Sequence, residues 1–388
     1  MEHVLVIGGG IAGVSTAYLL SKQGFRVTVV DKCMDVGCET SFLNGGLLCP
    51  SLSYPWSNTS AIPVALQSAF ANDKNRQAIR LNPALISSAL AWRWMGSFAW
   101  NMAPWKVASN HVASYNLCEY SLKCMKEEKD QGVLFTALGS LQVFGIEASA
   151  LARKSVMDRM KNSKTEILNW LEIKQLVPVI ETKVQYGVLS HGDTSGDVFK
   201  FTTSLKRLCD PDKVRFLPNT SIEGLEIKNK TILHAVTSTG SKMHADKYVV
   251  ATGNGAPPLA VLAGDVLLSL PVKGYSVHVP VSEASLMYNV CDDIGKFYCS
   301  PVPGPAVRLS AFAEIGYSDT TPHPDRGTAL IEMANDRFEP GFLLKEQAVV
   351  HACCRPQTPD DLPVIGPSAN IKNLWYVTTS TSSFPNMN

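Results

Sequence analysis

The first thirty residues alternate between apolar runs and glycine-containing turns. Residues 4–7 (VLVI) form a short, fully apolar run, which is typical of a strand that a parallel sheet buries on both faces. Apolar positions then recur at helical spacing over residues 11–18, and Gly24 follows as a helix stop. A second run, residues 26–30 (RVTVV), is rich in β-branched side chains. The pattern predicts a strand, a helix and a second parallel strand.

Three glycines connect the first strand to the helix at G-x-G-x-x-G spacing. In this spacing Gly8 permits the tight turn, Gly10 lets the backbone approach a pyrophosphate, and Gly13 allows close packing of helix and strand. Asp31 ends the second strand, where a carboxylate accepts hydrogen bonds from ribose hydroxyls. The order of these features predicts a dinucleotide site. Its expected residues are Gly8, Gly9, Gly10, Ile11, Ala12, Gly13, Asp31 and Lys32.

Two later segments extend this prediction. Residues 38–50 (CETSFLNGGLLCP) are polar and glycine-rich, which suits a loop that wraps a large cofactor but also an ordinary surface loop. An apolar run over residues 248–251 ends in Thr-Gly-Asn-Gly, where backbone can approach a nucleotide closely. The candidates here are Thr40, Ser41, Asn44, Gly45, Gly46, Thr252 and Gly253.

Composition and charge disfavour a nucleic-acid-binding protein, a zinc protein and a secreted protein. The 388 residues carry a net charge of +1, and lysine and arginine form no basic tract, so nothing favours a nucleic-acid partner. The ten cysteines include no C-x-x-C pair, which disfavours a structural zinc site. Acidic Glu2 stands where a signal peptide would be basic. We therefore expect a cytoplasmic protein with reduced thiols.

Residues 85–105 (LISSALAWRWMGSFAWNMAPW) raise the question of membrane contact. The stretch is rich in tryptophan and its one charged residue is Arg93. An arginine at the centre of a bilayer costs several kcal/mol, roughly 2.5–3.5 on insertion scales, which disfavours a membrane-spanning helix. The pattern favours a core helix and leaves an interfacial helix open.

The opening residues IGGGIAGVSTAYLLSKQGFRVTVVDK and the following ETSFLNGG resemble the bacterial D-amino acid dehydrogenases of the D-amino acid oxidase, glycine oxidase and sarcosine oxidase superfamily. The resemblance covers almost the whole chain, through HGDTSGDVFKFTTSL, YVVATGNGAPPL, LPVKGYSVHVPV, RPQTPDDLPVIG and KNLWYVT. It implies FAD as cofactor, oxidative deamination of D-amino acids, and electron transfer to quinone by a peripheral membrane protein. A glycine- or sarcosine-type oxidase that releases hydrogen peroxide is the alternative.

The resemblance also implies a domain organisation. We expect an α/β protein in which a doubly wound, Rossmann-like FAD domain is interleaved with an α+β substrate domain. Residues 1–85, 190–260 and 350–388 are assigned to the FAD domain, and residues 86–189 and 261–349 to the substrate domain. Residues 148–176 carry apolar positions at helical spacing and are expected to be helical. The resemblance further makes Ile222 a contact of the adenine.

Flavin chemistry of this kind needs a cation for the substrate carboxylate more than it needs a catalytic base. Arg355 is the candidate, since a guanidinium matches a carboxylate with two parallel hydrogen bonds. The resemblance places the arginine of its RP-x-TPD motif at this position, although a structural salt bridge to Asp360 or Asp361 is the alternative. Tyr275 could add a hydroxyl or be a core residue. We assign no catalytic side chain, and expect His191 to be structural.

Two departures from the family pattern bear on the flavin. After NLWYV the family continues into a Gly-His-Gly turn and a helix, whereas this chain reads TTSTSSFPNMN. We therefore expect weaker FAD retention, and an inactive, truncated isoform becomes a third hypothesis. Cys353 stands seven residues before Asp360, the position at which sarcosine oxidases attach flavin covalently. A buried, unmodified thiol is the favoured interpretation here.

Overall fold

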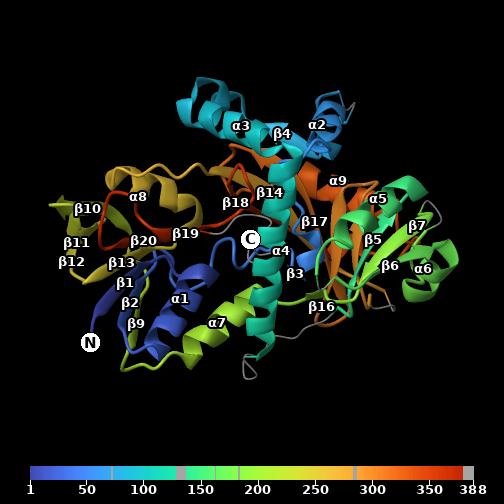
Figure 1. The fold of residues 1–388 in the computed structure, drawn as a ribbon. Helices are drawn as coiled ribbons and strands as arrows, with labels where there is room; N and C mark the ends of the chain where they lie inside the picture. The colour runs from blue at the N-terminus through green and yellow to red at the C-terminus, as the bar shows by residue number, and fades with distance from the viewer. Residues whose placement is uncertain (71–72, 128–136, 162, 182–183, 283–285, 379–388) are drawn as a thin grey trace.

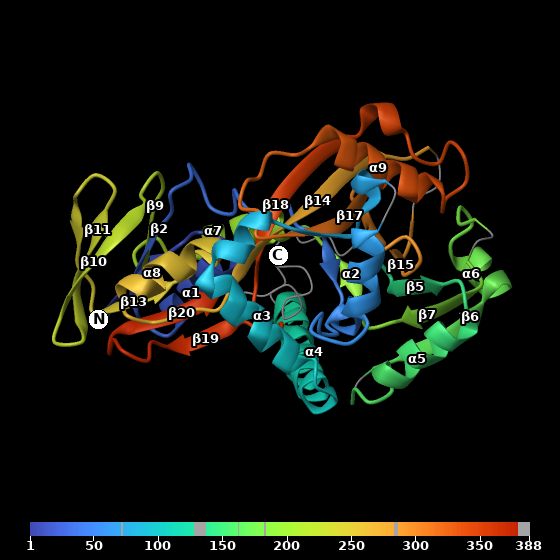
Figure 2. The same cartoon turned by 90° about the horizontal axis from the view of Figure 1, so that it is seen from above.

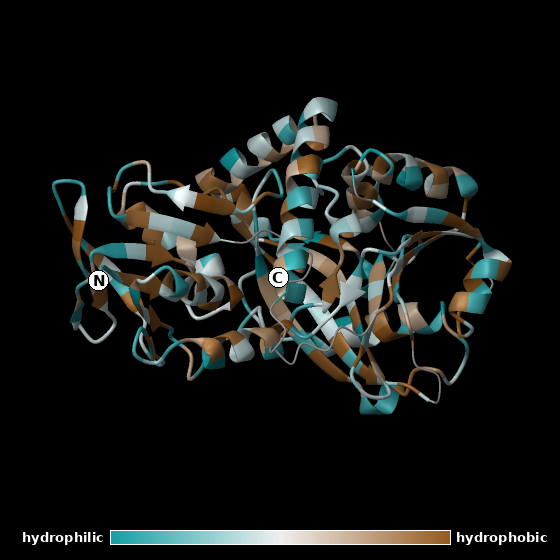
Figure 3. Cartoon of the chain, turned by 60° about the horizontal axis from the view of Figure 1, so that its bottom comes forward, coloured by the Kyte–Doolittle hydropathy of each residue, from teal (hydrophilic) through white to brown (hydrophobic). Residues whose placement is uncertain are grey.

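Two sheets form the centres of two lobes that lie side by side (Figures 1 and 2). The protein is described by a computed structural model, which covers residues 1–388 except 71–72, 128–136, 162, 182–183, 283–285 and 379–388. Brown, apolar segments concentrate in the strands of both lobes (Figure 3), as burial of the sheets between helices requires.

The N-terminal lobe is built on a six-stranded sheet in the order β19-β20-β13-β1-β2-β9. Its pairings are parallel except for the antiparallel edge pair β19–β20. The strands are β1 (His3–Ile7), β2 (Arg26–Val30), β9 (Val214–Leu217), β13 (Lys247–Val250), β19 (Val364–Pro367) and β20 (Leu374–Thr378). This is the Rossmann-like sheet that the opening pattern predicts.

Helices and a small sheet cover the two faces of this Rossmann-like sheet. One face buries apolar side chains of α1 (Ile11–Lys22) and α7 (Val198–Leu208). The other face is covered by α8 (Ala256–Leu262) and by a three-stranded antiparallel sheet. The strands of that small sheet are β10 (Ile222–Lys228), β11 (Thr231–Thr237) and β12 (Lys242–Met243). Each face of the sheet is thereby closed to water.

The second lobe is built on a nine-stranded, mainly antiparallel sheet in the order β18-β14-β17-β16-β15-β5-β7-β6, with β4 paired to β17. Helix α9 (Pro324–Asn335) packs on it over the largest apolar core of the molecule. The strands are β4 (Ile79–Leu81), β5 (Ser140–Phe144), β6 (Thr165–Asn169), β7 (Tyr186–Ser190), β14 (Leu270–Pro280), β15 (Asn289–Asp292), β16 (Phe297–Val302), β17 (Ala306–Ile315) and β18 (Val349–Gln357).

The remaining elements surround this second sheet and the junction between the lobes (Figure 2). A short pair, β3 with β8, lies at the junction. The elements are α2 (Ala61–Ala69), α3 (Ala89–Asn101), α4 (Pro104–Glu127), α5 (Glu147–Met157), α6 (Trp170–Leu176), β3 (Leu47–Leu48) and β8 (Thr194–Ser195). Single 3-10 turns span Pro50–Leu52, Lys74–Arg76, Pro83–Ser87, Gly253–Gly255 and Lys345–Gln347.

The predicted fold class is confirmed, and one element prediction is wrong. Residues 148–176 do not form one helix, because β6 lies between α5 and α6 and pairs with β7. An edge position on the sheet overrides the helical spacing there. The predicted domain boundaries stay a prediction. Two strands within the segments assigned to the FAD domain, β4 and β18, pair in the second sheet instead.

The tryptophan-rich segment 85–105 is divided between α3 and the start of α4. Trp94 is buried, whereas Trp92, Trp100 and Trp105 are 59%, 62% and 66% exposed. Within the described ranges, no helix combines the length and the apolarity that crossing a membrane demands. The segment is therefore part core and part exposed surface.

Candidate nucleotide and substrate site

The glycine turn holds β1 against both α1 and β13. Gly8 has a φ of +111°, and a Cβ on it would lie 2.4 Å from the carbonyl oxygen of Ala251. A Cβ on Gly13 would lie 1.9 Å from the carbonyl oxygen of Gly8. Side chains at either position would push the turn away from its neighbours. The close packing that the G-x-G-x-x-G spacing predicts is thus present.

Asp31 lies beside this turn, as the sequence predicts. One carboxylate oxygen accepts a hydrogen bond from the N–H of Gly9 at 2.5 Å, and the other accepts from the N–H of Cys33 at 2.7 Å. Ile222 is buried in the same apolar core as β1 and β2. Lys32 points elsewhere, into an exposed ion pair with Glu39 at 2.7 Å.

The loop over residues 40–46 reaches from the start of α1 to the second sheet. Ser41 Oγ accepts a hydrogen bond from the N–H of Ile11 at 3.0 Å. Asn44 braces the loop from within, since its amide donates to the carbonyl of Ser41 and accepts from the N–H of Gly46. Thr40 Oγ1 donates to the carbonyl of Cys354 in β18 at 2.9 Å. The loop therefore joins the two lobes and is not an ordinary surface connection.

Beside the glycine turn, a threonine that follows β13 has a buried hydroxyl group without a hydrogen-bond partner among the described residues. Thr252 Oγ1 is buried and has no hydrogen-bond partner within the described part of the chain. Gly253 follows with a φ of +52°. A buried hydroxyl without a partner is costly unless a ligand supplies one. With the α1 N-terminus, the glycines and Asp31, this residue fits a dinucleotide.

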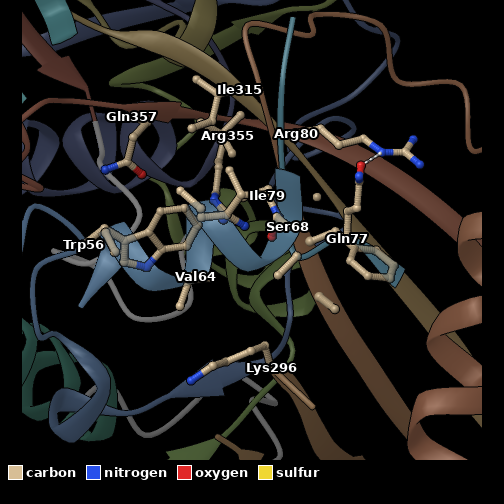
Figure 4. Close-up of a pocket in the computed structure, with 18 of the residues that line it drawn as sticks. Trp56, Val64, Ser68, Gln77, Ile79, Arg80, Lys296, Ile315, Arg355 and Gln357 are labelled. Atoms are coloured by element: carbon tan, nitrogen blue, oxygen red, sulfur yellow. Dashed lines mark hydrogen bonds between the residues drawn. The ribbon is translucent and has the colours of Figure 1, made fainter. Parts of the chain in front are cut away.

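A cavity of about 960 Å³ opens beyond the loop, on the second sheet. Leu43 and Gly45 border it from the loop, Leu47 from β3, and Arg355 and Cys353 from β18. Figure 4 shows it from within, with Arg355 beside Trp56 and with Lys296 and Arg80 farther away. This volume lies at the upper end of the range for small-molecule sites.

Arg355 extends into this cavity from β18, opposite Val272 of β14. Its guanidinium carbon lies 4.7 Å from the centre of the Trp56 ring, a cation–π distance. A Cβ on Gly274 would lie 3.1 Å from its Nη1, so the missing side chain there makes room for the guanidinium. Its Nε is buried without a partner, and burial lowers the pKa of Arg355. Throughout the described ranges Arg355 forms no ion pair.

The two aspartates that could have engaged Arg355 have other partners. Asp361 accepts hydrogen bonds from the side chain of Gln357 and from the N–H of Ser57. Its burial raises the pKa of Asp361 to about 6. Asp360 accepts from the N–H of Leu362 at 3.2 Å. The geometry favours the substrate clamp over the structural salt bridge.

Tyr275 belongs to the cavity lining, yet its ring lies on the other face of the sheet. Pairing puts Arg355 opposite Val272 and Tyr275 opposite Ala352, on alternate faces. The ring contacts Phe312 edge-on at 5.8 Å between centroids, and the guanidinium carbon of Arg326 lies 5.6 Å from its centroid, under α9. Burial raises its pKa to about 12. The suggested hydroxyl contact with a carboxylate at Arg355 is therefore not supported, and the core interpretation fits.

Two further sequence candidates have clear surroundings. Cys353 Sγ donates a weak hydrogen bond to the carbonyl of Leu43 at 3.5 Å, and burial raises the pKa of the thiol to about 11. His191 forms a half-exposed pair with Glu166 at 2.8 Å, away from the cavity lining. These surroundings suit an unmodified thiol and a structural histidine.

Sequence reasoning missed the residues that shape the surroundings of Arg355. Trp56 lies 299 positions earlier in the chain, and only the fold brings its ring to the guanidinium. Gly274 is one glycine among 27, and its role depends on the register between β14 and β18. The tryptophan within the polar stretch SYPWSN was the one local signal, because an isolated large aromatic ring tends to have a specific contact.

Comparisons with known proteins agree with this geometry. The family model described as "FAD dependent oxidoreductase" (DAO) matches residues 3–383. The D-amino acid dehydrogenase of Paramagnetospirillum magneticum is 30% identical over 387 residues, which cover 97% of this chain and 89% of that protein. The enzyme of the same name from Rhodopseudomonas palustris is 30% identical over 94% and 86%.

Solved structures share the fold at lower identity. Glycine oxidase from Geobacillus kaustophilus superimposes with a TM-score of 0.72 at 19% identity, over 99% of this chain and 92% of that one. The L-α-glycerophosphate oxidase of Mycoplasma pneumoniae, solved with FAD bound, gives 0.73 at 19% identity, over 99% and 93%.

Proposed function

The chain belongs to the FAD dependent oxidoreductase family, and we propose that within it the protein oxidises D-amino acids to 2-oxo acids and ammonia. FAD is its cofactor, and the family resemblance of the sequence motifs is confirmed. One observation supports the substrate class above others. Arg355 is a cavity-lining guanidinium without a carboxylate partner in the described structure, beside the loop that leads from the nucleotide cradle.

In this proposal the residues around α1 and β13 hold the cofactor. The α1 N-terminus with Gly8–Gly13 receives the pyrophosphate, Asp31 the ribose, and Ile222 borders the adenine. Thr252 offers its buried hydroxyl. The further contacts proposed are Lys32, Thr40, Ser41, Asn44, Gly45, Gly46 and Gly253.

Arg355 would orient the substrate. Its guanidinium binds the substrate carboxylate with two parallel hydrogen bonds, while the Trp56 ring restricts the movement of the guanidinium. Bound FAD supplies the acceptor for the hydride that leaves the α-carbon. A neutral substrate amine needs no strong protein base, and water hydrolyses the imino acid product to the 2-oxo acid and ammonia.

The electron acceptor is proposed as quinone, or another acceptor, at a membrane surface. The exposed rings of Trp92, Trp100 and Trp105 support a peripheral contact, because aromatic side chains favour the membrane interface. A glycine- or sarcosine-type oxidase that reduces O₂ is the second candidate, since glycine oxidases share the fold. Residues 379–388 lie outside the described residues, and the expectation of poor FAD retention stays a prediction.

The visible spectrum of the purified protein tests the proposal. Flavin bands that bleach anaerobically with D-amino acids but not with the L-isomers would support it, and Arg355→Met should slow the bleaching by about 10²–10³-fold at matched substrate concentration. Hydrogen peroxide release in air, with glycine or sarcosine as substrate, would favour the oxidase. A flavin-loaded protein that no D-amino acid bleaches would refute the proposal, and a chain that cannot be reconstituted with FAD would indicate the inactive isoform.

A further inference from the structure

We infer that the amino acid oxidised at this site carries a bulky apolar side chain. The inference rests on the proposed function, and concerns the part of the cavity that extends from Arg355 toward α2, α3 and β4. If the substrate carboxylate is bound at Arg355, this part is where a side chain can extend.

The walls of this part are apolar and spaced to admit a large group. Val64 of α2 and Ile79 of β4 line the same cavity as Arg355 (Figure 4). The three alanines of α2 that line the cavity, Ala61, Ala65 and Ala69, leave space where larger side chains would fill it. Further apolar side chains of this wall include Ile62, Leu81, Trp94, Met95, Phe98, Met102 and Ile315. Such a surface favours an aromatic or branched side chain over a methyl group.

The acidic side chains of the lining already have cationic partners within the protein. Asp292 forms a buried ion pair with Arg337, and Asp293 pairs with Lys296 at 2.9 Å. A substrate lysine or arginine side chain would therefore lack a carboxylate partner here.

An anionic side chain is also disfavoured, because the cations nearest the apolar wall are engaged. Arg80 pairs with Glu314 at 3.5 Å and donates to Gln77 at 3.3 Å. Lys74 is exposed at the rim of the cavity, where solvent screens its charge. The walls thus discriminate against charge of either sign.

Two apolar side chains of the cavity lining are exposed to solvent, and they favour a bulky apolar substrate independently of the wall. Ile62 and Leu81 line the cavity and yet are 52% and 61% exposed. A bulky apolar ligand would cover these side chains, and a small or charged one would leave them in water. The free energy gained by covering apolar surface therefore also favours a bulky apolar substrate.

Anaerobic reduction of the bound flavin measures the preference directly. D-phenylalanine and D-leucine should be oxidised with kcat/KM at least about tenfold above that of D-alanine, since one or more methylenes in an apolar pocket are worth 10–200-fold. D-lysine and D-glutamate should be worse than D-alanine. If D-alanine or D-glutamate is the best substrate, the inference is wrong and the proposed function stands. If no D-amino acid reduces the flavin, the proposed function itself fails.

A pair of variants on α2 localises the effect. Val64→Trp should lower kcat/KM for D-phenylalanine about tenfold and leave D-alanine within threefold. Leu66→Trp is the matched control, since Leu66 is on the same helix, 54% exposed and outside the cavity lining, and should alter neither substrate. Equal losses for both substrates in Val64→Trp would contradict the assignment of the wall. If that variant does not load FAD, the substrate order of the wild-type protein decides.

Discussion

Replacement of Gly13 by alanine tests whether the α1 turn is the cofactor cradle. The added Cβ would lie 1.9 Å from the carbonyl oxygen of Gly8, whereas such contacts essentially never fall below 3.0 Å. Helix and turn must therefore separate by about 1.1 Å, the difference between these two distances. Forced overpacking of this kind costs about 1–3 kcal/mol. It would also displace the N-terminal end of α1, whose N–H groups receive the pyrophosphate in the proposed cofactor geometry.

FAD binding and stability are measured separately. If the displaced N–H groups weaken FAD binding by about 1.4–2.8 kcal/mol, the dissociation constant rises about 10- to 100-fold, which fluorescence titration of the apoprotein with FAD detects. Gly96→Ala in α3 is the matched control, because its Cβ meets nothing within 4 Å and its φ is ordinary. That control should leave FAD affinity unchanged and stabilise the helix by about 0.5–1 kcal/mol. An FAD affinity of Gly13→Ala within twofold of wild type would refute the reasoning.

Three other changes have definite expected outcomes. Arg355→Met should lower kcat/KM by about 10²–10³-fold, since losing a charged hydrogen-bonding partner costs roughly 3–4 kcal/mol. Arg355→Lys should recover part of this loss, because it keeps the positive charge. Anaerobic flavin reduction measures both variants. Acid precipitation should release all flavin into the supernatant, because the Cys353 thiol, with a pKa raised to about 11, is protonated and poorly nucleophilic; flavin retained on the protein would contradict this. Burial raises the pKa of Asp193 to about 6 from 3.8, so the folded state binds more protons between about pH 4 and 6 and the free energy of unfolding falls as pH rises through that window. Urea titrations at pH 4.5 and 7 should show a smaller decrease in the free energy of unfolding for Asp193→Asn than for the wild-type protein. Equal decreases would show that Asp193 does not cause this pH dependence.

The glycine turn and its flanking strands could be predicted from the sequence, because the residues that determine them are close together in the chain. Strand, turn, helix and acid occur within Val4–Asp31, and each is constrained by its own sequence chemistry: β-branched runs, glycines at a turn, and a polar strand end. The loop that follows was ambiguous from sequence, because a polar, glycine-rich stretch suits solvent as well as a ligand. The hydrogen bond from Thr40 to the carbonyl of Cys354 spans 314 positions, and no local pattern encodes it.

The part of the site around Arg355 could not be predicted, because its geometry also depends on pairing between distant segments of the chain. Tyr275 and Arg355 are both credible carboxylate ligands by residue type, and only the register between β14 and β18 sets them on opposite faces of the sheet. A shift of β18 by one residue would turn Arg355 to the face on which Tyr275 lies. The misassigned strand β6 likewise owes its conformation to pairing with β7, although its sequence fits a helix.

The site's polar contacts converge on one short part of β18. The carbonyl of Cys354 accepts hydrogen bonds from Thr40 of the loop and from Asn254 of the 3-10 turn that follows β13. The next residue, Arg355, lies in the cavity. The proposed cofactor cradle and the proposed substrate clamp are therefore tied to the same strand, in adjacent residues. A packed strand moves as a rigid unit. Changes that remove a tether of the loop, such as Thr40→Val, should therefore misplace Arg355 as well as the cofactor. The family motif around RPQTPDD thus combines a structural tether with the proposed ligand of the substrate carboxylate, and in this proposal a sequence signature far from the glycine turn belongs to the same site.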